Sequence, residues 1–147
     1  MYQRILVPVD GSDTAQRALD EATRLASALQ AELRIITVID PFLINRESIY
    51  FDTDMVRQDL QAAGRELLET SRTMAAKEVI TVSTQLVELD KPTTSIAEMV
   101  AAEAQDWSAD LIVVGSHGRR GVQRLLLGSV AEGVARNAPV PVLLVRH

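Results

Sequence analysis

The sequence predicts an α/β fold, a doubly wound five-stranded parallel sheet in the strand order 3-2-1-4-5, as a single domain over residues 1–147. Short runs of branched apolar residues alternate with longer segments of helical periodicity along the whole chain, which is typical of βαβ units. The run Leu111-Ile112-Val113-Val114 is apolar at every position, as expected of a central strand that is covered on both faces.

The predicted strands are short, and most of them end at a turn. The first ends in Asp10-Gly11-Ser12, a turn in which the side chain of Ser12 or Asp13 can cap the following helix. The last strand is an apolar edge if it ends the sheet. We predict strands at Ile5 to Val9, Leu33 to Ile39, Val79 to Leu89, Asp110 to Gly115 and Val140 to Val145.

The predicted helices carry apolar residues at three- and four-residue spacing, which places those residues on one buried stripe. The segment from Phe42 to Thr53 shows neither period and is predicted to be a loop with room for a short helical piece. In the second helix the predicted stripe consists of Val56, Leu60, Ala63, Leu67, Ser71 and Met74. The helices are predicted to run from Ala15 to Leu29, from Asp54 to about Lys77, from about Thr94 to Gln105 and from Ser129 to Arg136.

The composition excludes several classes of site. The chain has no cysteine and only two histidines, His117 and His147, so disulfides, thiolate metal sites, cysteine nucleophiles and histidine-rich metal centres are excluded. The formal net charge of −5 argues against binding along a nucleic-acid backbone, which needs a cationic face. The N-terminus lacks the pattern of a secretory signal, and no apolar run reaches the length of a membrane helix, about eighteen residues, so a cytoplasmic location without a membrane partner is expected.

The most informative stretch follows the predicted central strand and opens the last helix. It reads Gly115-Ser116-His117-Gly118, then nine residues, then Gly128-Ser129-Val130. Glycines allow a close approach of the backbone, so successive N–H groups can converge on phosphate oxygens, and the start of a helix favours an anion. Arg119, Arg120 and Arg124 lie in the same loop and can offset phosphate charge. The alternative is an ordinary loop with a glycine turn and a serine cap.

Ligands of open α/β sheets bind beyond the carboxyl ends of the strands, where the winding direction reverses. Strands one and four flank that point, so we expect Asp10 and Gly115 to face the same crevice. Asp10 is placed for a metal or adenine contact, and its alternative role is helix capping. His117 has no identifiable acidic partner, which favours contact with the ligand backbone or solvent over a role as general base. Ser116 is not in a nucleophile elbow, because the pattern G-x-S-x-G is absent.

The arrangement G-x2-G-x9-G-S resembles the ATP-binding signature of the universal stress protein family at every fixed position. The segments 5–12, 109–115, 125–132 and 139–145 are also similar to that family. The resemblance implies a Rossmann-like fold of the adenine nucleotide alpha hydrolase type, ATP as ligand and a backbone contact of Val38 with adenine. No separate metal site is expected, and any Mg²⁺ would enter as a counter-ion of the phosphates, with Asp10 as its contact. With the loop residue Arg119 added, the expected nucleotide-binding set is Pro8, Val9, Asp10, Val38, Gly115, His117, Gly118, Arg119, Gly128, Ser129 and Val130.

Three functions are compatible with these residues. The first is a nucleotide-dependent regulatory module of the stress response, in which ATP changes a dimer surface and the contact with an unknown protein partner. No dedicated catalytic base is evident, so turnover should be slow or nil. The second is a slow ATP-hydrolysing or adenylyl-transferring enzyme on the same site. The third is a scaffold that binds nothing.

The resemblance also implies a homodimer formed through the last strand, residues 140–145. An exposed apolar edge invites pairing with another chain, and a twofold axis covers both edges at once. The alternative is a monomer whose edge is protected by Pro141.

Overall fold

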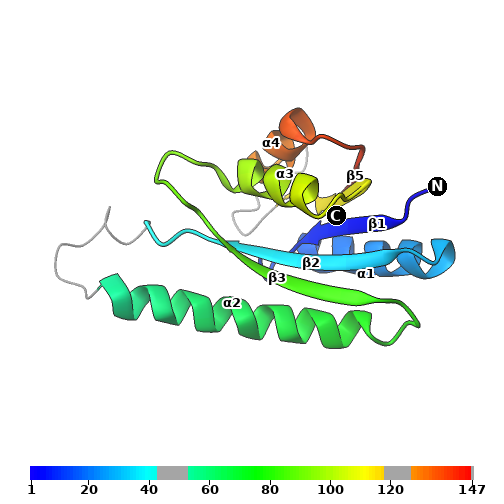
Figure 1. Ribbon diagram of the computed structural model, residues 1–147, viewed down its shortest axis with the longest axis horizontal. Coiled ribbons are helices and arrows are strands. Elements are labelled where there is room, and N and C mark those ends of the chain that lie inside the picture. Colours follow the sequence, from blue (N-terminus) through cyan, green and yellow to red (C-terminus); the bar gives the residue numbers. More distant parts are fainter. Residues whose placement is uncertain (43–52, 118–126, 147) are drawn as a thin grey trace.

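The computed structural model describes residues 1–42, 53–117 and 127–146, and its strands form one parallel sheet (Figure 1). The order β3-β2-β1-β4-β5 confirms the predicted topology. Every neighbouring pair is parallel, and the winding direction reverses between β1 and β4. The strands are β1 Arg4–Pro8, β2 Glu32–Ile39, β3 Val82–Glu88, β4 Leu111–Gly115 and β5 Val142–Val145.

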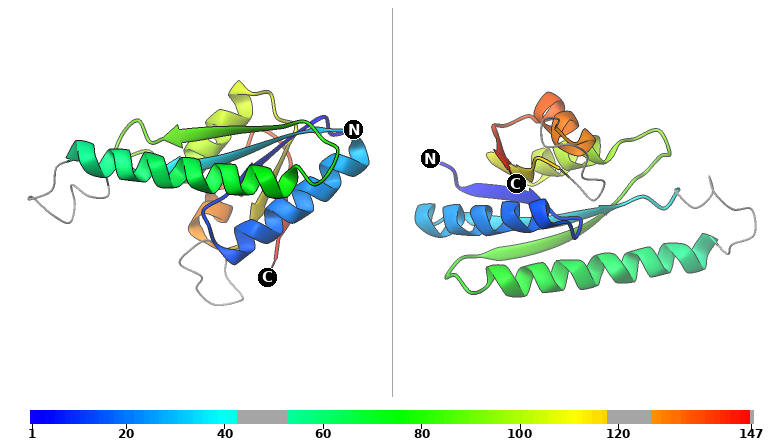
Figure 2. Two further views of the ribbon diagram at one scale, coloured as in Figure 1. Left: turned by 90° about the horizontal axis from the view of Figure 1, so that it is seen from below. Right: turned by 180° about the vertical axis from the view of Figure 1, so that it is seen from behind.

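In the described ranges, four helices cover the two faces of the sheet (Figure 2). α1 and α2 lie on one face, and α3 and α4 lie together on the other. This alternation follows from right-handed crossovers that switch side at the reversal of strand order. The helices are α1 Asp13–Leu29, α2 Thr53–Ala75, α3 Ile96–Asp106 and α4 Ser129–Asn137.

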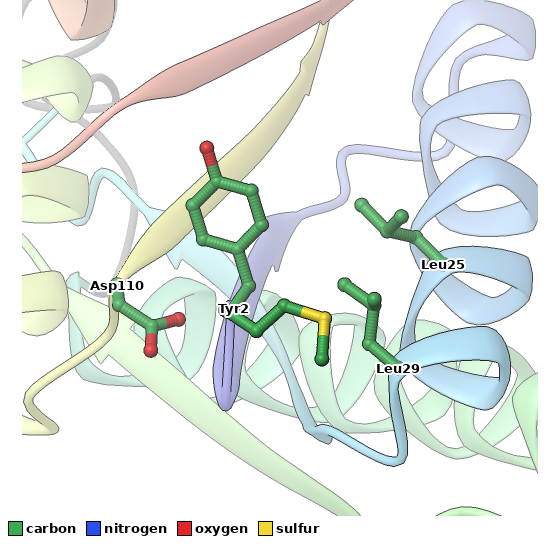
Figure 3. A pocket seen from close by; sticks show the side chains of 5 residues that line it. Tyr2, Leu25, Leu29 and Asp110 are labelled. Atoms are coloured by element: carbon green, nitrogen blue, oxygen red, sulfur yellow. The ribbon is translucent and has the colours of Figure 1, made fainter.

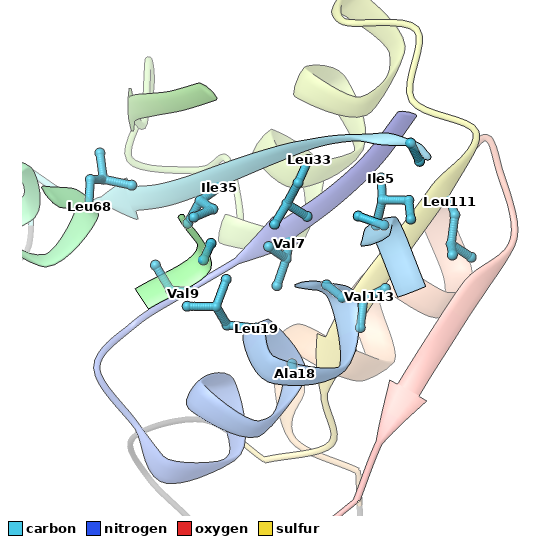
Figure 4. Packing of buried hydrophobic residues seen from close by; sticks show 14 residues of the cluster. Ile5, Val7, Val9, Ala18, Leu19, Leu33, Ile35, Leu68, Leu111 and Val113 are labelled. Atoms are coloured by element: carbon cyan, nitrogen blue, oxygen red, sulfur yellow. The ribbon is translucent and has the colours of Figure 1, made fainter. Parts of the chain in front are cut away.

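β4 divides its side chains between two apolar cores. Leu111 and Val113 belong to the core under α1 and α2, whereas Ile112 and Val114 belong to the core under α3 and α4. All four are buried, which confirms the prediction that this strand is covered on both faces. Figure 4 shows the core under α1 and α2. The members that it labels are Ile5, Val7, Val9, Ala18, Leu19, Leu33, Ile35, Leu68, Leu111 and Val113.

Side-chain caps define the starts of two helices. The Ser12 hydroxyl accepts a hydrogen bond from the Ala15 N–H at 3.2 Å, so Ser12 rather than Asp13 is the N-cap of α1. α3 begins at Ile96 because Ser95 and Glu98 form a reciprocal capping box, with both bonds at 3.1 Å.

β3 is shorter than predicted. It begins at Val82 rather than Val79, because the chain turns back after α2 before it joins the sheet. The Glu78 N–H donates to the Ala75 carbonyl at 3.2 Å in this turn, and Val79 is 95% exposed. The prediction placed Val79 in the strand because it is a branched apolar residue, but it lies in the turn before the strand.

β5 also begins later than predicted, at Val142 rather than Val140. Pro141 has no N–H to donate, although its carbonyl accepts from the Ile112 N–H at 3.0 Å. The other predicted helices and strands agree with the observed ones to within two residues at each end. The predicted loop from Phe42 to Thr53 lies, apart from its first and last residues, outside the described part of the chain.

The buried face of α2 differs from the predicted stripe. Ala63 and Met74 are exposed, whereas Gly64 and Leu68 are buried. A Cβ atom at Gly64 would lie 2.6 Å from Cδ1 of Leu86, so the absence of a side chain lets α2 approach β3 closely. Apolar periodicity missed this face because it does not count a glycine as a contact residue.

An ion pair joins α2 to the carboxyl end of β3. Arg57 donates to both carboxylate oxygens of Glu88, at 3.2 and 2.5 Å, and the Gln61 amide donates at 2.6 Å. The hydrogen bond from Arg57, followed by that from Gln61, holds the pKa of Glu88 below its usual value, and partial burial opposes this shift.

We expect Glu88→Gln to lower the thermal midpoint modestly near neutral pH, because both partners are partly exposed. A carboxyl whose pKa is lowered by folding adds stability above its unfolded pKa, about 4.3, and loses it as the pH falls through the folded-state pKa. The difference between variant and wild type should therefore shrink as the pH falls through the folded-state pKa of Glu88. Thermal melts across this range test it, and an equal difference at every pH would contradict the role of the ionised carboxylate.

None of the helices in the described ranges is both long and apolar enough to cross a membrane.

Candidate functional site

The carboxyl ends of β1 and β4 meet at the reversal of strand order, and both lie against the N-terminus of α1. The chain leaves β1 through Val9 and Asp10 and leaves β4 through Ser116 and His117. The buried Thr14 hydroxyl, in the first turn of α1, donates a hydrogen bond to the His117 carbonyl. The two segments that the sequence assigned to one site are thus joined through α1, a helix that the sequence predicted but did not assign to the site.

Gly115, the last residue of β4, packs on the backbone of α1. A Cβ atom at this position would lie 2.8 Å from the carbonyl carbon and oxygen of Thr14 and 3.1 Å from the Ala15 nitrogen. Backbone atoms cannot move aside as a flexible side chain can. Gly115 was predicted as a ligand contact, and its described environment shows a packing role.

Ser116 is the junction of three segments and is almost fully buried, with 3% of its surface exposed. Its N–H donates to the Val145 carbonyl at 2.9 Å, and its carbonyl accepts from the Gly128 N–H at 2.7 Å. Its hydroxyl lies 3.0 Å from Nδ1 of His117. Ser116 therefore brings Gly128, the start of α4, to the end of β4, so the two halves of the glycine motif become neighbours.

The N-terminus of α4 differs from those of α1 and α3. Gly128 is its N-cap, in an extended conformation with φ −62° and ψ 157°, and no side chain accepts a hydrogen bond as a cap there in the described residues. The first N–H groups of a helix need acceptors and carry the positive end of its dipole. Ser129, the first helical residue, is exposed, and Val130 packs against the core under α3 and α4. This end of α4 can therefore receive an anion.

Val38 directs its backbone N–H and C=O, rather than its side chain, toward the candidate site. Alternate residues of a parallel strand direct N–H and C=O toward the same neighbour. The Ile39 carbonyl accepts from Leu89 on the β3 side. The Ile36 carbonyl accepts from the Val9 N–H on the β1 side. Val38 therefore points its N–H and C=O to the β1 side, where β1 has ended, and neither group has a partner among the described residues.

Asp10 has a local structural role. Its Oδ1 accepts a hydrogen bond from the Ser12 N–H at 2.9 Å, which stabilises the turn from β1 into α1. The cap itself is Ser12, so the alternative prediction that Asp10 caps the helix is corrected. Within the described ranges, no three acidic or imidazole side chains are grouped as metal ligands would be.

The remaining predicted residues divide into two sets. Pro8 ends β1 and His117 follows β4, so both lie at the reversal of strand order. Gly118 and Arg119, together with Arg120 and Arg124, lie outside the described residues.

A separate groove of about 650 Å³ lies at the opposite, amino end of β1 and β4 (Figure 3). Its walls are Met1, Tyr2, Leu25, Leu29 and Asp110. The Asp110 carboxylate accepts from the N–H groups of Gln3 and Arg4 at 2.8 and 3.0 Å, so it ties the chain before β1 to the chain before β4. This groove is apolar and distant from the residues of the candidate site.

The fold and the site define an open, doubly wound α/β protein in which no described side chain caps the helix N-terminus where the winding reverses. A family model described as the universal stress protein family matches residues 1–146. The chain belongs to the universal stress protein family. Universal stress protein MJ0531 of Methanocaldococcus jannaschii is 36% identical to it, over 99% of this chain and 83% of that protein.

Solved structures agree with this assignment. The structure of the hypothetical protein MJ0577 superimposes with a TM-score of 0.85 and 28% identity, covering 100% of this chain and 97% of that one. A universal stress protein in complex with cAMP gives 0.73 and 30%, over 98% and 97% of the two chains. One from Archaeoglobus fulgidus in complex with dAMP gives 0.68 and 25%, over 98% of each. The ligands of these last two proteins are adenine nucleotides.

Proposed function

We propose that this chain, as one domain over residues 1–147, binds ATP where the winding of the sheet reverses and serves as a nucleotide-dependent regulatory module of the stress response. The observation that carries the proposal is the N-terminus of α4. Its amides lack a side-chain cap in the described residues, and the Gly128 N–H to Ser116 carbonyl bond holds this helix end beside β4. Helix amides of this kind bind phosphate.

In the same proposal, the backbone of Val38 on β2 binds the adenine base. The open N–H and C=O of Val38 form a donor and acceptor pair, and adenine presents a ring-nitrogen acceptor beside an amino donor. The two universal stress proteins solved with cAMP and dAMP support an adenine nucleotide as the ligand class. In this proposal Pro8, Val9 and Asp10 border the nucleotide, and the glycine motif holds the phosphates. The Asp10 carboxylate would supply an oxygen to a Mg²⁺ counter-ion of those phosphates.

A regulatory role is favoured over an enzyme by the chemistry of the described residues. Hydrolysis needs a group that positions or deprotonates the attacking water. Nδ1 of His117 lies 3.0 Å from the Ser116 hydroxyl, so its neighbour at this nitrogen is a hydroxyl and not a carboxylate. Slow ATP hydrolysis or adenylyl transfer on the same site remains the second candidate.

We further propose that two copies pair through residues 140–145. β5 is an edge strand of the sheet that the structure describes, and Leu143 on it is 37% exposed. Pairing of two such edges covers both. Sedimentation over a range of protein concentrations tests this, and a monomer at every concentration would exclude it.

The nucleotide bound during expression tests the functional proposal directly. The protein is purified without added nucleotide and denatured, and the released compound is identified. We expect the released compound to be ATP, because a regulatory module without hydrolytic activity would keep its ligand intact. ADP together with steady phosphate release would favour the enzyme instead. An empty protein that also shows no heat of ATP binding by calorimetry would leave only the scaffold.

A further inference from the structure

The backbone pairing of β1 and β2 stops abruptly beside the proposed base site. The last paired residues are Pro8 and Ile36, and the next bond runs from the Val9 N–H to the Ile36 carbonyl at 2.8 Å. A continued parallel ladder would next place the Val38 N–H on the Val9 carbonyl. That bond is absent in the described ranges, although both residues lie at the right point of the register.

A side chain takes the place of the missing bond. The hydroxyl of Thr37 donates to the Val9 carbonyl at 2.8 Å. Thr37 is buried, with 5% of its surface exposed, so the carbonyl that it satisfies is also removed from competition by water. A buried carbonyl is almost always paired, and here the partner is a hydroxyl instead of the next backbone amide.

Packing on α2 holds this hydroxyl in place. A Cβ atom at Gly64 would lie 3.4 Å from Cγ2 of Thr37, so the methyl group of Thr37 faces the glycine of α2. A β-branched side chain has few rotamers, and seating its methyl group directs its hydroxyl. The methyl group of Thr37 thus faces Gly64 of α2, while the hydroxyl of the same side chain bonds the Val9 carbonyl.

We propose that Thr37 is a positioning residue for base recognition: its hydroxyl occupies the Val9 carbonyl and thereby keeps the Val38 N–H and C=O open to an adenine base. This role rests on the proposed function, since it concerns the base of the same nucleotide. Thr37 itself does not touch the base. It sets the point at which β1 separates from β2, and the backbone of Val38 then supplies the hydrogen bonds.

Three variants separate the hydroxyl from the shape of the side chain. Thr37→Val keeps the shape and removes the hydroxyl, Thr37→Ser keeps the hydroxyl, and Thr37→Ala serves if the valine variant does not fold. The first measurement is hydrogen exchange of the Val38 amide by NMR in the absence of nucleotide. The second is calorimetric binding of ATP and of inorganic triphosphate, which has no base.

We expect a rapidly exchanging Val38 amide in the wild type and in Thr37→Ser. In Thr37→Val the Val9 carbonyl has lost its donor, so the Val38 N–H should pair with it and become protected. The affinity for ATP should then fall about tenfold or more, as for the loss of one base hydrogen bond, while that for triphosphate stays unchanged. A role of Thr37 in stability alone would not change the ratio of the two affinities.

Two results would overturn the role of Thr37: a Val38 amide already protected in the nucleotide-free wild type, or an ATP to triphosphate affinity ratio that Thr37→Val and Thr37→Ala leave unchanged. The first result is measured on the wild type, so it does not depend on whether a variant folds. A wild type that binds neither ligand refutes the proposed function instead, and amide exchange still decides whether Thr37 keeps Val38 unpaired.

Discussion

Gly128→Asp should weaken ATP binding by at least about 100-fold and leave the fold intact. The extended conformation of Gly128 suits any residue, and aspartate is a favoured N-cap. Its carboxylate would accept from the same amides that we assign to the phosphates and would add a negative charge there. The variant should therefore be a few tenths of a kcal/mol more stable than the wild type. Calorimetric titration with ATP and thermal melts measure the two effects.

Two controls separate the causes of this loss. Gly128→Asn caps the helix without a charge, so it should weaken binding less than aspartate does. Ala135→Glu adds the same charge on the exposed far part of α4 and should leave ATP affinity unchanged. Normal ATP binding by Gly128→Asp would show that the phosphates do not lie at this helix end.

Gly115→Ala should destabilise the protein by about 1–3 kcal/mol, a large effect for one methyl group. The new Cβ atom would lie 2.8 Å from the Thr14 backbone, so β4 and α1 must separate at the point where their ends support the candidate site. Denaturant unfolding monitored by circular dichroism measures the loss. ATP binding should weaken as well, because the Thr14 bond to the His117 carbonyl depends on the same contact.

Gly64→Ala is the matched control for this substitution. The closest atom to its new methyl group is Cδ1 of Leu86, the end of a flexible side chain, at 2.6 Å. Replacing a helical glycine by alanine also gains about 1 kcal/mol in helix propensity. The net change should therefore be close to zero. Equal losses for the two variants would show that the contact of Gly115 with backbone atoms has no special cost.

Most of the fold could be predicted because its signals are local. Apolar runs located the strands, and the reversal of strand order followed from the connection rules. The turn after β1 limited the cap of α1 to Ser12 or Asp13, and the structure selects Ser12. The errors arose where a neighbour decides the outcome: Val79 belongs to a turn, and the contact face of α2 centres on Gly64 because β3 lies close to it.

The candidate site was predicted less completely. The glycine motif located the ends of β4 and α4, and the resemblance to the family supplied the nucleotide and the Val38 contact. Three residues were missed or left without a role: Thr14, Thr37 and Ser116. Each acts through a hydrogen bond to a backbone carbonyl or amide far away in the chain. No pattern in the sequence marks such a partner.

By itself the sequence determined the class of fold and the strand order and assigned segments to the candidate site, because periodicity and turn chemistry act over a few residues. Only the tertiary structure decided what those segments do to one another. It made Gly115 a packing residue on α1, joined Ser116 to Gly128, and opened the backbone of Val38. These outcomes depend on contacts such as that between Thr14 and His117, 103 residues apart, which form only when the sheet brings the ends of its strands together.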